Sequence, residues 1–309
     1  MPLRLLPDET KIAFMRNAPL AFPASLLAMV AALALFFIVG LNLGIDFKGG
    51  TLIEVQSAAA EADIGGIRSE LGALGLGDVE VQGFGAPNEV LIRIEAQPNG
   101  ETGQQTAIKA VQDTLGFTDY EYRRVEVVGP KVSGELARTG TIAVLVTLLG
   151  VLLYIWFRFE WQFAVGAVAA LVHDVVLTIG FFAIVQLEFN LSSIAAILTI
   201  VGYSLNDTVV VYDRVRETLR KFKKTAITDL IDLAVNQTLS RTLLTSLTTL
   251  IALGALFFFG GAVIRSFTAA MIWGVFVGTY SSIFIAAPLL IYFKLRPAAA
   301  GGSTGPAKA

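Results

Sequence analysis

The 309-residue sequence contains no cysteine and only one histidine, His173. Without cysteine the chain has no disulfide, no thiolate nucleophile and no cysteine metal site. An intramembrane protease needs a nucleophile and a base, or paired metal ligands, and the sequence holds no HExxH motif. These absences argue against an intramembrane enzyme such as a protease, and we expect no cofactor or metal.

Charge is also scarce. Charged residues make up 16% of the chain, against about 25% in soluble domains, whereas hydrophobic residues make up 55%. The net charge of −2 gives no electrostatic reason to expect nucleic acid as a partner. This composition favours a protein embedded in the lipid bilayer.

Long apolar runs predict six membrane spans. A run of about 20 helical residues crosses a 30 Å hydrocarbon core. The first run could instead be a cleaved signal peptide, but it is long for one and no small-x-small site ends it. The predicted fold is therefore a six-helix membrane bundle, with spans at 22–41, 141–157, 163–187, 192–212, 243–259 and 267–293.

Basic residues predict the orientation of the bundle. In a six-span arrangement they gather on one side, where positive charge marks the cytoplasm. Both termini are then cytoplasmic, and the long polar segment between the first two spans is periplasmic. The basic residues are Arg4, Lys11, Arg16, Arg158, Arg214, Arg216, Arg220, Lys221, Lys223, Lys224, Lys294 and Arg296. The expected organisation is a cytoplasmic segment (1–21), the first span (22–41), a periplasmic domain (42–138), the other five spans (139–294) and a disordered cytoplasmic tail (295–309).

The polar segment has the pattern of a small α+β domain. Alternating apolar residues predict strands, and the longer amphipathic stretches predict helices. The order βαββαβ is that of a ferredoxin-like domain, which does not by itself indicate a function. The predicted strands are 51–56, 79–84, 90–95 and 120–128, and the predicted helices are 63–74 and 104–115.

One carboxylate is predicted to lie deep in the membrane. Asp207 falls well inside the fourth span, beside Asn206 and near Ser204. A carboxylate in lipid costs several kcal/mol, so such a residue is usually paired, protonated or functional. We favour a role in proton or ion movement, and the alternative is a structural hydrogen bond between helices.

Four other charged or titratable residues in the spans are more ambiguous. Asp213 lies where the fourth span leaves the lipid, which favours an interfacial ion pair. The adjacent His173 and Asp174 point about 100° apart on the third span. His173 fits proton transfer and simple packing equally well, whereas Asp174 is favoured as functional. Arg241, at the start of the fifth span, either reaches toward Asp207 or extends to the interface.

Several motifs together resemble the SecF side of the SecD/SecF family of the bacterial Sec protein-export machinery. The most specific is VGYSLNDTVVVYDRVRE at 201–217. The others are GIDFKGGT at 44–51, LVHDVV at 171–176, QTLSRTLLTS at 237–246 and the glycine pair at 260–261. The resemblance extends from about residue 12 to residue 293.

The resemblance implies a non-enzymatic motor subunit with the RND-like half-bundle architecture. Such a subunit pairs with SecD, binds the SecYEG channel and uses the proton-motive force to help export an unfolded preprotein across the inner membrane, with YajC as a further partner. It implies that Asp207 and Arg241 belong to the proton pathway. Asn206, Asp213, His173 and Asp174 are given supporting roles. The segment with Asp46, Gly49 and Gly50 looks like a hinge to the periplasmic domain.

The sequence holds no second copy of the bundle, so SecD is expected as a separate chain. An RND-type exporter of small molecules or lipids is the alternative function, because its bundle would follow the same physics. Such exporters need larger periplasmic domains than the one predicted here. Proton coupling and sodium coupling both remain open at this point, since a carboxylate with nearby hydroxyls serves either ion.

Overall fold

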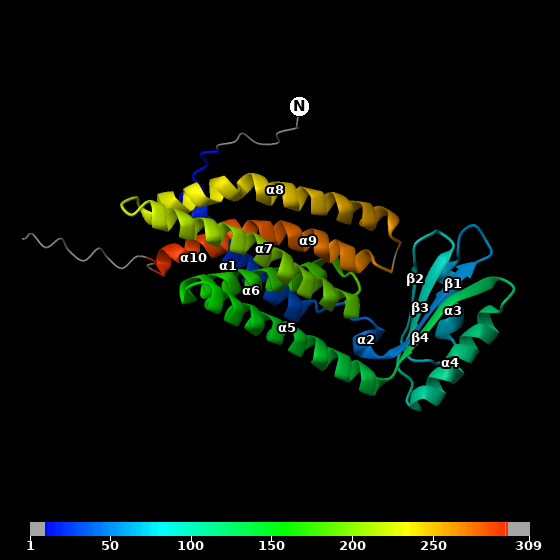
Figure 1. Cartoon of the computed structure of the whole chain (residues 1–309). Coiled ribbons are helices and arrows are strands. Elements are labelled where there is room, and N and C mark those ends of the chain that lie inside the picture. The colour runs from blue at the N-terminus through cyan, green and yellow to red at the C-terminus, as the bar shows by residue number, and fades with distance from the viewer. Residues whose placement is uncertain (1–9, 262, 294, 296–309) are drawn as a thin grey trace, which may run out of the picture.

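The computed structural model describes residues 10–261, 263–293 and 295, which form a helical bundle with a sheet domain at one end (Figure 1). Three of the basic residues used to predict orientation, Arg4, Lys294 and Arg296, lie outside the described residues. So does nearly all of the predicted tail.

Six helices in the described part of the chain are long and apolar enough to cross a membrane, which confirms the predicted number. The last of them is interrupted by a π-helical turn, η1. The helices are α1 (Phe14–Ile38), α5 (Pro130–Arg158), α6 (Trp161–Val185), α7 (Leu191–Lys221), α8 (Ile227–Phe259) and the composite of α9 (Arg265–Ser281), η1 (Ser282–Ala286) and α10 (Ala287–Tyr292).

Several helices extend beyond the predicted apolar runs. Helix α8 begins at Ile227, although its apolar run begins only at 243. Helix α1 begins at Phe14, and Asp232 of α8 accepts a hydrogen bond of 2.9 Å from the backbone N–H of Met15. This carboxylate caps α1 from a distant part of the sequence, because the N-terminal N–H groups of a helix have no partner within the helix.

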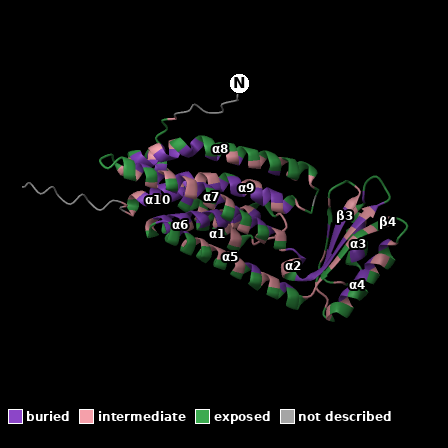
Figure 2. Cartoon of the chain, viewed as in Figure 1, coloured by how far each residue is buried: buried purple, intermediate pink, exposed green. Residues whose placement is uncertain are grey.

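The helices form a buried centre and an exposed periphery. Most of the apolar part of α9–α10 and about half of that of α6 and α7 is buried, whereas α1, α5 and α8 expose long faces (Figure 2). These faces carry apolar side chains such as Leu27, Leu145 and Ile251. Exposed apolar surface of this extent is typical of a membrane or of a partner interface.

The sheet domain follows the predicted order of elements. Its elements are β1 (Gly50–Ser57), α3 (Ile64–Gly72), β2 (Val79–Gly83), β3 (Glu89–Ile94), α4 (Gly100–Leu115) and β4 (Tyr120–Val128). The strands are antiparallel in the order β2-β3-β1-β4. Both helices pack on one face, where Ile53, Ile67 and Val111 share one apolar cluster. Asp63 caps α3 as predicted, since it accepts a hydrogen bond from the Gly66 N–H at 2.9 Å.

Candidate functional site

Asp207 lies on α7 and is buried, with 3% of its surface exposed. Its Oδ2 atom and the hydroxyl of the neighbouring Thr208 are also buried, and neither has a hydrogen-bond partner among the described residues. Buried polar atoms are normally paired, so an unpaired carboxylate oxygen requires an explanation. A carboxyl group with a free oxygen inside a bundle can take up and release a proton or bind a small cation.

Arg241 on α8 is the cation that acts electrostatically on Asp207. Its side chain is exposed, and no hydrogen bond or ion pair joins it to Asp207 in the part of the chain that the structure describes. The Arg241 guanidinium therefore acts on the Asp207 carboxylate through its charge and makes no direct contact with it.

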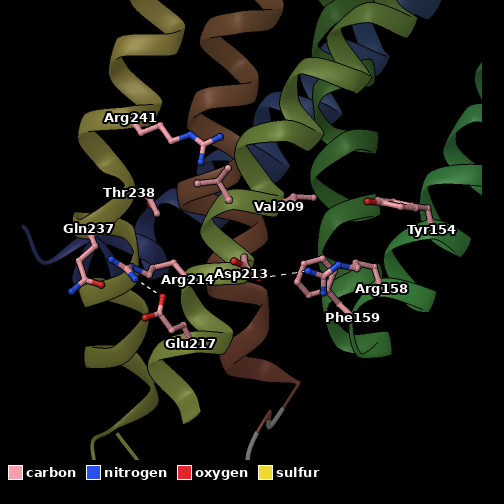
Figure 3. Close-up of a pocket in the computed structure, with 11 residues that line it drawn as sticks. Tyr154, Arg158, Phe159, Val209, Asp213, Arg214, Glu217, Gln237, Thr238 and Arg241 are labelled. Atoms are coloured by element: carbon pink, nitrogen blue, oxygen red, sulfur yellow. Dashed lines mark hydrogen bonds and ion pairs between the residues drawn. The ribbon is translucent and has the colours of Figure 1, made fainter. Parts of the chain in front are cut away.

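Arg241 lines a cavity of about 500 Å³ between α5, α7 and α8, at the end of the bundle away from the sheet domain (Figure 3). Acidic and basic side chains both line the cavity. Asp213 forms an ion pair with Arg158 at 4.0 Å, and Arg214 pairs with Glu217. Charged side chains of both signs therefore line the cavity beside Arg241.

Asp213 and Asn206, two of the predicted supporting residues, lie on exposed parts of α7. The side chain of Asp213 is 66% exposed and its partner Arg158 is 50% exposed. Asn206 is adjacent to Asp207 in sequence but points about 100° away from it. Neither residue shares the buried environment of Asp207.

His173 and Asp174 belong to a different, fully buried polar cluster. The Oδ1 atom of Asp174 lies 2.9 Å from His173 Nδ1. Its Oδ2 atom accepts hydrogen bonds from Ser204 on α7 at 2.5 Å and from Ser281 on α9 at 2.8 Å. The ring of His173 stacks on Tyr280 with centroids 6.1 Å apart. This carboxylate is satisfied by three partners on three helices.

The predicted hinge segment contacts the bundle directly. Gly49 and Gly50 have φ angles of +75° and +120°, which favour glycine. Asp46, in the short helix α2 (Ile45–Lys48), accepts a hydrogen bond of 2.8 Å from the backbone N–H of Leu191, the first residue of α7. The segment that leads into the sheet domain therefore touches the helix that carries Asp207.

A further contact between the sheet domain and the helical bundle, a region called the joint below, was not predicted from the sequence. Arg93 of β3 forms ion pairs with Glu80 at 2.7 Å and with Glu188, in the loop between α6 and α7, at 2.9 Å. Burial raises the pKa of the Glu188 carboxyl above its ordinary value, and the Arg93 guanidinium opposes that shift. A charged residue in a short loop gives no sequence signal for such a long-range partner.

Among the described residues, no group of three or more histidine, aspartate or glutamate side chains is placed to hold a metal ion. In the described part of the chain, the geometry instead offers a buried carboxylate with an unpaired oxygen and an arginine nearby, a cavity with charged lining beside that arginine, and a separate satisfied carboxylate.

Comparison with known proteins identifies the family. The model described as "Protein export membrane protein SecD/SecF, C-terminal" matches residues 107–296, and the SecD/SecF GG motif matches residues 34–61. The chain belongs to the SecD/SecF family. The six apolar helices and this family membership together make it a multi-pass membrane protein.

The relatives in this family occur in two lengths. The protein translocase subunit SecF of Rhodobacter capsulatus is 45% identical, and the match covers 95% of this chain and 92% of that protein. The subunit SecDF of Brucella abortus is 47% identical over 96% of this chain, which spans only 39% of that longer protein. The crystal structure of SecDF from Thermus thermophilus, described as a translocon-associated membrane protein, matches with a TM-score of 0.83 at 35% identity. That match covers 94% of this chain and 40% of the other.

Proposed function

We propose that this chain is the SecF-type half of a SecDF motor, which uses the proton-motive force to assist SecYEG-dependent export of unfolded polypeptides. Relatives named as protein translocase subunits support the export role. The observation that carries the proton role is the buried Asp207 carboxylate with its unpartnered Oδ2 atom.

In this proposal, Asp207 binds and releases the driving proton and Arg241 responds to its charge. A charged Asp207 attracts the guanidinium of α8, and protonation removes that attraction. The relative positions of α7 and α8 then depend on the protonation state, which is the requirement for a two-state motor element. The cavity beside Arg241 supplies water from one side of the bundle.

The proposed partner is a SecD half. The fused SecDF relatives support this pairing, because the chain matches about two fifths of their length. The exposed faces of α5 and α8 and the exposed Asn206 on α7 offer a surface for a second bundle. The SecYEG channel and YajC are further proposed partners.

We place the bundle in the inner membrane with both termini in the cytoplasm and residues 42–138 in the periplasm. The antiparallel strand order β2-β3-β1-β4, with two helices on one face, supports a ferredoxin-like periplasmic domain. The cluster Arg214, Arg216, Arg220 and Lys221 at the end of α7 away from that domain supports the orientation.

The experiment is an export assay in membrane vesicles that contain the SecD half and a SecY-type channel, with proton and sodium gradients imposed separately. We expect a proton gradient to stimulate export by the wild type and by Asp213→Asn. Asp207→Asn should assemble normally and lose the stimulation entirely, because an asparagine side chain does not take up a proton at the pH of the assay.

Asp213→Asn is the matched control, because it removes an aspartate from the same helix at an exposed position. Full stimulation by Asp207→Asn would contradict the proposed proton site. Stimulation by sodium alone would contradict the proposed driving ion while leaving the export role in place.

A further inference from the structure

The buried cluster around Asp174 joins three helices at one carboxylate. Asp174 on α6 accepts hydrogen bonds from Ser204 on α7 and Ser281 on α9, and His173 Nδ1 lies 2.9 Å from its other oxygen. Asp174, Ser204 and Ser281 are completely buried. One Asp174 oxygen accepts from hydroxyls on two other helices, so the cluster ties α6, α7 and α9 together and fixes their relative positions.

A close approach between α7 and α9 makes the cluster possible. A Cβ atom added at Gly278 of α9 would lie only 2.9 Å from the Cβ of Ser204. Gly278 ends the GxxxG stretch 274–278, a motif that permits close helix packing in membranes. The absence of a side chain at this position therefore brings Ser204 close to the core of the bundle.

Ser204 lies one helical turn before Asp207. Three residues on an α-helix are separated by about 4.5 Å along the axis and by about 60° around it. Any rotation or slide of α7 that redirects the Asp207 carboxylate must therefore also move Ser204 relative to Asp174.

Ser204 and Asp207, at the two ends of this helical turn, differ in their polar contacts. Ser204 has a short hydrogen bond to Asp174, whereas Asp207 Oδ2 and Thr208 Oγ1 have no hydrogen-bond partner among the described residues. The hydrogen bond of Ser204 thus ties α7 to α6 beside the unpaired carboxylate, whereas Tyr203 and Tyr212 tie α7 to Ser246 on α8 at 3.3 Å and to the Ala286 carbonyl at 3.1 Å.

We propose that Asp174 is a positioning residue that acts through Ser204 to hold α7, and with it Asp207, in the orientation from which the proton is bound. This inference rests on the proposed proton role of Asp207. Among the titratable and charged groups, His173 on α6 contacts Asp174 directly, Tyr280 on α9 stacks on the His173 ring, and Arg241 on α8 acts on Asp207 through its charge.

The test compares Ser204→Ala with Ser281→Ala in the same export assay, measured as a function of pH. Each substitution removes one hydrogen bond to the same Asp174 oxygen, so their direct effects on that carboxylate are matched. Only Ser204 is on α7. We expect Ser204→Ala to shift the midpoint of the pH profile by at least about half a unit and Ser281→Ala to leave it unchanged.

Equal midpoints for the wild type, Ser204→Ala and Ser281→Ala, with Asp207→Asn still inactive, would overturn the positioning role and leave the proposed proton site intact. Stimulation that survives Asp207→Asn would instead overturn the proposed function itself. If Ser204→Ala does not assemble, Gly278→Ala serves in its place. It keeps the hydroxyl but forces Ser204 away, and it should shift the midpoint in the same assay.

Discussion

Asp174 and Asp207 are both buried carboxylates in the centre of the bundle, but their surroundings are opposite. Asp174 has partners on both oxygens, from two serines and a histidine. Asp207 has an oxygen with no partner among the described residues, and an arginine that acts on it only electrostatically. Burial alone therefore does not identify the proton site. The satisfied carboxylate fixes helices, and the unsatisfied one is available for a ligand.

The strongest test of this difference is the stability of two truncations. Asp174→Ala removes the shared partner of Ser204, Ser281 and His173 and leaves the buried Ser204 hydroxyl without an acceptor, whereas Ser281 keeps the Gly278 carbonyl at 3.2 Å. We expect a loss of about 3 kcal/mol in the free energy of unfolding. Asp207→Ala removes a group with an unpaired oxygen and should stay within about 1 kcal/mol of the wild type. Thermal unfolding of the purified full chain in detergent measures both. A larger loss for Asp207→Ala would reverse the proposed roles.

A second test breaks the packing that brings Ser204 to Asp174. Gly278→Ala adds a Cβ atom at 2.9 Å from that of Ser204 and should cost about 1.5 kcal/mol. Gly254→Ala on α8 is the control, because no heavy atom lies within 4 Å of its added Cβ. It should be neutral or stabilising by up to about 1 kcal/mol, since alanine has the higher helix propensity. Equal effects of the two substitutions would mean that the close approach of α7 and α9 contributes little.

Glu188 is a third carboxylate with an intermediate environment, because it is largely buried but paired with Arg93. Its pKa is raised above the ordinary value of 4.5, so the folded state holds the proton more tightly than the unfolded chain. The free energy of unfolding should therefore fall as pH rises from 4.5 through the raised pKa.

The measurement is the thermal midpoint of the full chain against pH, with and without Glu188→Gln. The substitution should remove this part of the pH dependence, whereas Glu54→Gln, elsewhere in the sheet domain, should retain it. An unchanged profile in Glu188→Gln would show that the joint does not respond to this carboxyl.

Asp213 is the most exposed of the four carboxylates Asp174, Asp207, Glu188 and Asp213, so its ion pair should contribute least to stability. Its ion pair with Arg158 is long and open to water, so Arg158→Gln should change the free energy of unfolding by less than about 0.5 kcal/mol. Chemical unfolding of the same preparation would detect a larger effect, which would mean that the mouth of the cavity is part of the folded core.

Hydropathy and strand patterning predict the elements of this fold well, because long apolar runs and alternating strands are local signals. They miss the true start of α1, because that start depends on Asp232, which lies far away in sequence. They also miss the start of α8. Its first turns contain no continuous apolar run, but Leu230 and Ile231 are buried in the bundle there.

The candidate site is less accessible to sequence reasoning. The cost of a carboxylate in lipid singles out Asp207 and Asp174 alike. It cannot separate them, because the difference depends on Ser204 and Ser281 meeting Asp174 in space. Serines in membrane helices are common, so neither carries a signal of its own. The contact between Asp46 and the start of α7 depends in the same way on tertiary packing.

Infrared difference spectroscopy of the SecD-paired complex in membranes, across the pH range in which export is stimulated, reports directly whether Asp207 takes up the proton. Protonation of a carboxylate produces a carboxyl C=O band that can be assigned by substitution. We predict a band that is present in the wild type and in Asp213→Asn and absent in Asp207→Asn. A band that persists unchanged in Asp207→Asn would contradict the assignment of Asp207 as the proton-binding group.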